Sequence, residues 1–107
     1  MMDVLEDDDD ELVIWLDGSA ELKTTGRAIN RIWRLLSNSF QPGEWTTSKY
    51  MAVQVIRELN LPVNPEEIWG GKNRARYLFP LIYHPLKYLE KEGYIHFTGR
   101  GDVSRIR

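Results

Sequence analysis

Residues 73–107 read NRARYLFPLIYHPLKYLEKEGYIHFTGRGDVSRIR, and this stretch decides the fold. Its first part, residues 73–92, predicts one helix because apolar residues recur at helical spacing. The residues expected to face a core are Ala75, Leu78, Ile82, Leu86 and Leu89. Gly93 is expected to end the helix, since glycine adopts the left-handed conformation without a Cβ penalty. Residues 94–98 and 103–107 then predict a two-stranded antiparallel ribbon around the turn at 99–102.

The opposite side of this helix carries basic and aromatic side chains. On a helical wheel they are Arg76, Tyr83 and Lys87, with His84 and Lys91 at the edge. A solvated polar face is one interpretation of this strip. A nucleic-acid surface is the other, and the basic ribbon that follows the helix favours it.

Pro80 and Pro85 interrupt the helical pattern. Neither has an N–H to bond to the carbonyl four residues earlier, so the carbonyls of Arg76 and Leu81 lose partners in an α-helix. Each interior proline costs about 3 kcal/mol. We expect one bent helix. The alternative is a break near Phe79, with a second helix that has Pro80 in its first turn.

The rest of the chain predicts three shorter helical segments and a strand. Residues 27–39 and 49–59 have helical apolar periodicity, and residues 65–69 form one turn that begins with proline. Residues 12–16 (LVIWL) favour a strand. Its partner is either residues 20–23, across a turn at Asp17-Gly18, or a strand elsewhere.

This order of elements resembles the winged helix-turn-helix superfamily. The similarity covers residues 47–107 and includes LEKEGYI (residues 89–95) at the join between helix and ribbon. It differs from the common pattern in its very short second helix and in the prolines of the long one. Many winged-helix regulators are dimers, so the resemblance also implies a homodimer.

The resemblance implies an α+β fold, namely a winged helix-turn-helix domain over residues 12–107. Its recognition helix would be residues 73–92 and its C-terminal β-hairpin wing residues 94–107. Residues 27–39 would be an added N-terminal helix.

Charge is distributed unevenly along the chain. The net charge is −2, but residues 1–21 hold nine acids and no base, so residues 22–107 hold all 14 Lys and Arg against seven acids. The acidic segment 1–11 is expected to be a disordered tail that solvates the chain, competes with DNA or binds a protein partner. Arg27, Arg31 and Arg34 form a stripe that is either solvated or phosphate-contacting.

Several classes of function are disfavoured by composition. Cysteine is absent, and His84 and His96 are too scattered for a metal site, so we expect no metal and no cofactor. No nucleophile with spaced His and acid partners occurs, which argues against an enzyme. We expect a cytoplasmic protein without a membrane span or signal peptide. The four tryptophans are expected to be buried.

We therefore expect a sequence-specific duplex DNA-binding protein that regulates transcription. The recognition helix would enter the major groove, and basic residues elsewhere would contact phosphates. The candidate DNA-binding residues are Arg27, Arg31, Arg34, Lys72, Arg74, Arg76, Tyr83, His84, Lys87, Arg100, Arg105 and Arg107. The alternative is a winged-helix module for protein assembly with no direct role on DNA.

Overall fold

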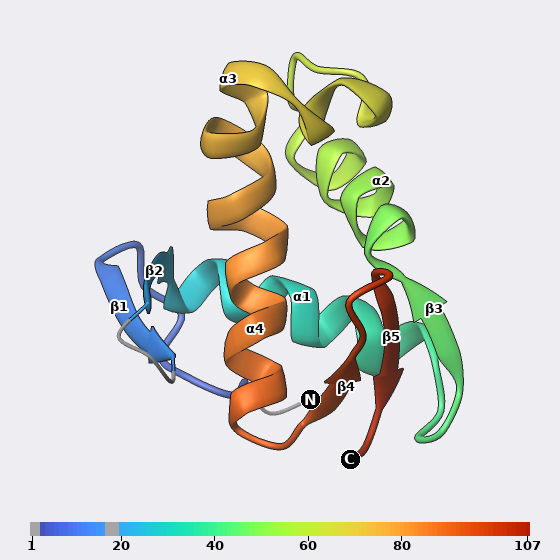
Figure 1. Ribbon diagram of the computed structural model, residues 1–107. Helices are drawn as coiled ribbons and strands as arrows, with labels where there is room; N and C mark the ends of the chain where they lie inside the picture. The colour runs from blue at the N-terminus through green and yellow to red at the C-terminus, as the bar shows by residue number, and fades with distance from the viewer. Residues whose placement is uncertain (1–2, 17–19) are drawn as a thin grey trace.

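A helical column over residues 71–91 runs through the centre of the structure, and the other elements pack around it (Figure 1). The computed structural model describes residues 3–16 and 20–107. The column consists of α3 (Gly71–Asn73), the π-helical segment η2 (Arg74–Tyr83) and α4 (His84–Lys91). The long helix is therefore continuous through both prolines, as expected, although its middle is not an α-helix.

The middle of the column has the π register, in which an N–H bonds to the carbonyl five residues earlier. The N–H of His84, for example, donates to the Phe79 carbonyl. The expected loss of partners at Arg76 and Leu81 assumed the α register, and the π register shifts that loss by one residue.

The carbonyl of Pro80 is satisfied from outside the helix. In the π register its donor would be residue 85, which is a proline without an N–H. The hydroxyl of Thr24 donates to this carbonyl instead, at 2.7 Å. Because Thr24 is only 3% exposed, a buried hydrogen bond holds this part of the chain against the column.

Thr24 belongs to an N-terminal hairpin. Strands β1 (Glu11–Leu16) and β2 (Ala20–Thr25) pair antiparallel, which settles the choice of partner for the first strand. The expected turn at Asp17-Gly18 lies outside the described residues. Ile14 points into the core, whereas Trp15 is 56% exposed, so the expectation that Trp15 is buried is wrong.

A second sheet has the strand order β3-β5-β4, formed by β3 (Trp45–Thr47), β4 (Ile95–Phe97) and β5 (Asp102–Arg105). The expected ribbon is present as β4 and β5. Strand β3 was not expected, because its residues suggested a turn and helix caps. It pairs with β5 so that Trp45 lies opposite Ser104 on the outer face. Trp45 is 56% exposed, and its expected burial is also wrong.

Two further α-helices and a 3-10 turn complete the α+β fold. Helix α1 (Gly26–Ser39) begins where the Thr25 hydroxyl accepts from the Ala28 N–H, and α2 (Ser48–Leu59) where Thr47 does the same for Tyr50. The 3-10 turn η1 (Pro65–Trp69) leads into the column. Side chains that are fully buried between these helices include Ile29, Ile32, Leu36, Met51, Val55, Ile68, Ile82, Leu86 and Leu89. Of the expected core residues of the column, Ala75 alone is exposed.

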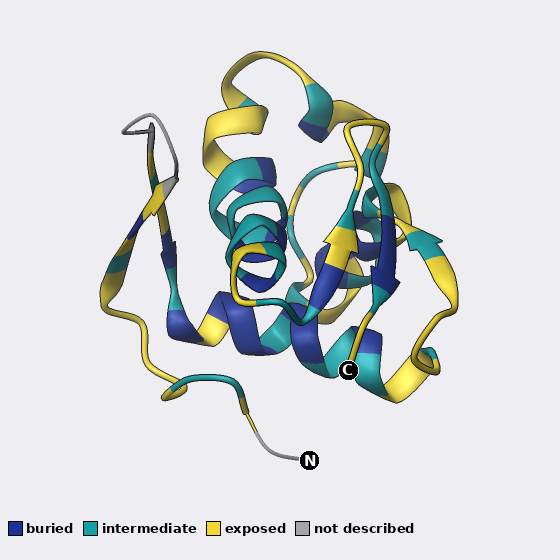
Figure 2. Cartoon of the chain, turned by 60° about the horizontal axis from the view of Figure 1, so that its bottom comes forward, coloured by how far each residue is buried: buried dark blue, intermediate teal, exposed yellow. Residues whose placement is uncertain are grey.

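Residues 3–10 lie along α1, as Figure 2 shows for the segment that leads from the N-terminus to β1. Asn30, which is fully buried in α1, accepts hydrogen bonds from the N–H groups of Val4 (2.9 Å) and Leu5 (3.0 Å). Its amide also donates to the Leu5 carbonyl at 2.6 Å. The structure therefore departs from the expected disordered tail over residues 1–11, because a buried side chain supplies partners to its backbone.

Replacing Thr24 by valine should test the link between hairpin and column. Valine has the shape of threonine but cannot donate, so the buried Pro80 carbonyl would lose its partner. We expect a loss of about 1–3 kcal/mol in the free energy of unfolding, measured by urea denaturation. Thr46→Val in β3 is the control, because the Thr46 hydroxyl has no hydrogen-bond partner within the described ranges. Equal stability of the two variants would contradict the role given to Thr24.

Candidate nucleic-acid interface

A cleft of about 250 Å3 lies between the column and the β4–β5 hairpin. Trp69, Tyr83 and Lys87 line the helical side, and Phe97 with residues 98–101 lines the hairpin side. Ser48, the first residue of α2, closes one end. Its lining contains two cations, Lys87 and Arg100, and no acid.

The tip of the β4–β5 hairpin is fixed in position beside α2. The Ser48 N–H donates to the Gly101 carbonyl at 2.7 Å. Gly101 has a φ of +88°, and a Cβ there would lie 2.8 Å from the Ser48 hydroxyl oxygen. Both the conformation and the close approach therefore require glycine. Within the tip, the Thr98 hydroxyl accepts from the N–H groups of Arg100 (3.3 Å) and Asp102 (3.1 Å).

Lys87 connects the column to the hairpin. Its Nζ lies 5.7 Å from the ring centroid of Tyr83 and 5.4 Å from that of Phe97. It also forms an ion pair of 3.3 Å with Glu90. Lys87 is half-buried and already has these partners, so it holds the cleft together rather than standing free to contact a base.

Four exposed cations near this cleft have no carboxylate partner within the part of the chain that the structure describes: Lys49, Lys72, Arg76 and Arg100. Lys49 is in the first turn of α2 beside the hairpin tip, and Arg100 is on that tip. Lys72 and Arg76 are on the N-terminal half of the column. Arg74, another expected site residue, donates twice to the Trp69 carbonyl, at 3.1 and 2.8 Å, and thereby holds η1.

The arginine stripe of α1 is neutralised within the molecule. The N-terminal segment supplies Asp9 to Arg27 at 3.0 Å, and both Asp3 (2.8 Å) and Asp7 (3.1 Å) to Arg34. Arg31 lies 3.9 Å from Glu58 of α2. None of the three arginines lines the cleft, so the structure does not join them to the column and the hairpin tip.

Arg105 and Arg107 lie at the base of the hairpin, away from its tip. The guanidinium of Arg105 lies over the Trp33 ring, 5.4 Å from its centroid. It also donates to the carbonyls of Phe40 and Arg107. Arg107 lies over the Tyr94 ring at 4.7 Å. These contacts give Arg105 a structural role in place of the expected phosphate contact.

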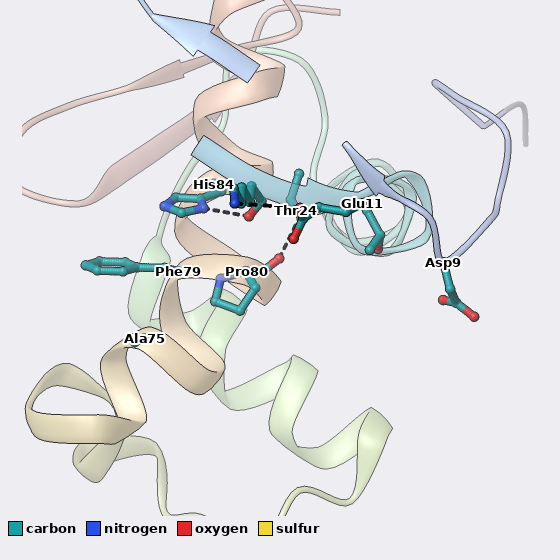
Figure 3. A pocket seen from close by; sticks show the side chains of 9 residues that line it. Asp9, Glu11, Thr24, Ala75, Phe79, Pro80 and His84 are labelled. Carbon is teal, nitrogen blue, oxygen red and sulfur yellow. Dashed lines mark hydrogen bonds and ion pairs between the residues drawn. The ribbon is translucent and has the colours of Figure 1, made fainter. Parts of the chain in front are cut away.

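His84 faces the N-terminal hairpin. Its Nδ1 lies 2.7 Å from the Lys23 carbonyl, which can only accept, so the ring donates this hydrogen bond. Its ring stacks on Phe79 with centroids 5.3 Å apart, as Figure 3 shows. Both rings border a second hollow, of about 410 Å3, between the hairpin and the column. Asp9 and Glu11 also line that hollow, which makes it less suited than the first to a polyanion.

Sequence reasoning missed the residues that position the site. Thr24 and Asn30 are buried polar side chains whose partners lie far away in the chain. Phe79 and Phe97 join the aromatic cluster at the cleft, but an isolated phenylalanine is ordinarily a core residue. A polar residue on an apolar helix face, such as Asn30, is the one signal that was available.

Comparison of the chain with protein-family models, with curated proteins and with solved structures found no match. Among residues 3–16 and 20–107, no helix is long and apolar enough to cross a membrane. The same residues hold no cluster of three or more His, Cys, Asp or Glu side chains that could bind a metal ion.

The ion pair between Asp3 and Arg34 predicts a pH dependence. The hydrogen bond from the Arg34 guanidinium holds the pKa of Asp3 below its ordinary value. The stabilisation is therefore complete above the ordinary carboxyl pKa, about 3.9, and is lost as the pH falls through the lower folded value. NMR titration of the Asp3 carboxyl should give a midpoint below about 3.9. Arg34→Gln should return that midpoint upward, and an unchanged midpoint would argue against the pair in solution.

The structural role of Arg105 can be tested by Arg105→Met. Methionine keeps an unbranched apolar stem but removes the donors to the Phe40 and Arg107 carbonyls and the cation over Trp33. Thermal or urea unfolding should show a loss of about 1–3 kcal/mol. Arg107→Met removes a cation from an exposed ring and should cost less, about 0.5–1 kcal/mol. The reverse order would show that Arg105 is not the residue that fixes the hairpin base.

Proposed function

We propose that this chain is a duplex-DNA-binding protein of winged-helix architecture that regulates transcription. The order of elements supports the architecture: α1, β3, α2, η1, the column, and then the β4–β5 hairpin. The sheet order β3-β5-β4 supports it too, since the hairpin pairs with the strand that precedes α2, as a wing does. This is an argument from fold alone, and folds host many functions.

The observation that carries the DNA-binding proposal is where unpaired positive charge lies. The cleft between column and hairpin has two cations and no acid, and Lys49, Lys72 and Arg76 stand near it without carboxylate partners among the described residues. The arginines of α1, in contrast, are neutralised by the N-terminal segment. A polyanion would therefore meet its strongest attraction at the cleft, although the whole chain carries a net charge of −2.

The proposed binding mode assigns different roles to the cations. The N-terminal half of the column, with Arg76 exposed, would lie in the major groove, where arginine reads the O6 and N7 acceptors of guanine. Arg100 on the hairpin tip and Lys49 beside it would contact phosphates, which fix the position of the protein without reading sequence. Lys87 would act indirectly, because it holds the tip against the column.

A second candidate function is protein assembly, and the outer face of the β3-β5-β4 sheet favours it. Trp45 (56% exposed) stacks on His96 with centroids 6.3 Å apart, and Ile106 is 45% exposed on the same side. These residues border a hollow of about 460 Å3. An apolar surface of this kind is typical of a contact with another protein or with a second copy of the chain.

The DNA-binding proposal predicts affinity for duplex DNA that falls steeply as salt rises. Fluorescence anisotropy with labelled duplexes at several salt concentrations would measure it. Arg100→Ala should weaken all duplexes alike and reduce the salt slope by about 1. Arg76→Ala should weaken a preferred site by about 1–3 kcal/mol more than random duplex.

Arg27→Ala is the matched control for these variants, because Arg27 is an exposed arginine that is already paired with Asp9. It should leave both affinity and salt slope unchanged. If wild-type protein binds no duplex at about 50 mM salt, the DNA-binding proposal is wrong. A change of oligomeric state in Trp45→Ala, measured by light scattering, would then support the assembly function.

A further inference from the structure

A row of four aromatic rings crosses the column and ends on the hairpin. In order they are His84, Phe79, Tyr83 and Phe97, with successive ring centroids 5.3, 5.7 and 5.7 Å apart. All four side chains are half-buried, so each is partly open to solvent. We call this row the aromatic ridge.

The π register assembles three of these rings. In an α-helix a side chain is adjacent to those three and four residues away. In the π register the turn closes on the fifth residue, and Phe79 contacts both Tyr83, four residues on, and His84, five residues on. Figure 3 shows the rings of Phe79 and His84 lying one above the other at the side of the column.

The ridge is separate from the apolar core. The column buries Leu78, Ile82, Leu86 and Leu89 on its other sides, and these residues pack against α1 and α2. Tyr83 and Phe97 have a packing role, because they hold the hairpin tip to the column through Lys87. The stack of Phe79 on His84 has no such role in joining the hairpin tip to the column.

We propose that the aromatic ridge is a stacking platform for unpaired nucleobases, so that the protein binds DNA whose strands are locally separated. The inference deepens the proposed function and rests on it for the polyanion, because the same cleft and the same cations would hold the backbone. What it adds is the kind of DNA: a strand whose bases are free to leave their partners.

The chemistry of the ridge fits unpaired bases better than paired ones. Base faces are hidden in a duplex, and only base edges and phosphates are open to a helix in the groove. A separated strand exposes its base faces, and stacking of a base on an aromatic side chain contributes about 1–3 kcal/mol. Every base has such a face, so the platform would tolerate any sequence.

Charge complementarity supports a nucleic-acid strand as the occupant of the ridge. Arg76 lies on the same helical segment as Phe79 and Tyr83, and Arg100 is on the hairpin tip beyond Phe97. A strand laid along the ridge would pass these two cations, which have no carboxylate partners within residues 3–16 and 20–107. An apolar peptide would gain nothing from either of them.

The test compares three labelled DNAs of one sequence: a fully paired duplex, the same duplex with a central stretch of mismatches, and the single strand. Anisotropy at one salt concentration gives their affinities. We expect the mismatched duplex and the single strand to bind at least about 5-fold more tightly than the paired duplex, which is the gain from stacking one base. A single-stranded RNA of the same sequence identifies whether the unpaired bases come from DNA or RNA.

Variants separate stacking from packing. Phe79→Leu and Tyr83→Leu keep apolar volume but remove the ring, and should each abolish about 5-fold or more of the preference for unpaired DNA. They should leave affinity for the paired duplex within about 2-fold, since the phosphate contacts remain. Tyr83→Phe keeps the ring and should retain the preference. Trp45→Leu is the control, because it removes an exposed ring from the outer face of the sheet, outside the ridge.

The outcomes distinguish the two proposals. Binding to paired and mismatched duplexes with equal affinity overturns the stacking platform and leaves the proposed duplex binding intact. Binding only to unpaired strands overturns the duplex proposal and supports the platform. A preference that survives both leucine variants, whose folding is checked by circular dichroism, places the stacking elsewhere and overturns the assignment to the ridge.

Discussion

One backbone carbonyl that its own helix leaves without a donor sets much of the architecture. In the π register Pro80 would receive its hydrogen bond from residue 85, and that residue is a proline. The buried hydroxyl of Thr24 supplies the bond, so the column depends on a strand that lies more than fifty residues earlier in the chain. The N-terminal hairpin is thus part of the helix's own hydrogen bonding, and the aromatic ridge inherits its register from the same constraint.

The distribution of charge follows from a second long-range contact. Asn30 holds the backbone of residues 4 and 5 against α1, and this brings Asp3, Asp7 and Asp9 to the arginines of that helix. The acids thereby neutralise a helix that the sequence offered as a candidate phosphate contact. The cations left without carboxylate partners among the described residues include those around the cleft, so two opposite charge runs resolve into one basic surface.

The sequence predicted the helices and the C-terminal hairpin because those depend on local patterns. Leu78, Ile82, Leu86 and Leu89 are buried as their spacing required. The third strand was missed, because three residues after a Pro-Gly turn have no pattern of their own and form a strand only by pairing with β5. The partners of Lys87 and Arg105 were missed for the same reason: Phe97, Trp33 and the Phe40 carbonyl are distant in sequence.

The π segment also changes how this helix would tolerate a change of length. Residues 74–83 complete fewer turns than an α-helix of ten residues would, so the segment holds surplus chain in its circumference. Deleting a residue there would let the remainder tighten to the α register, and Leu86 and Leu89 would keep their orientation toward the core. An added residue has no such outlet in α4, where it would rotate the buried face toward solvent. The column is therefore buffered against deletion but not against insertion, and the aromatic ridge, which needs the wide turn, would be the first feature lost.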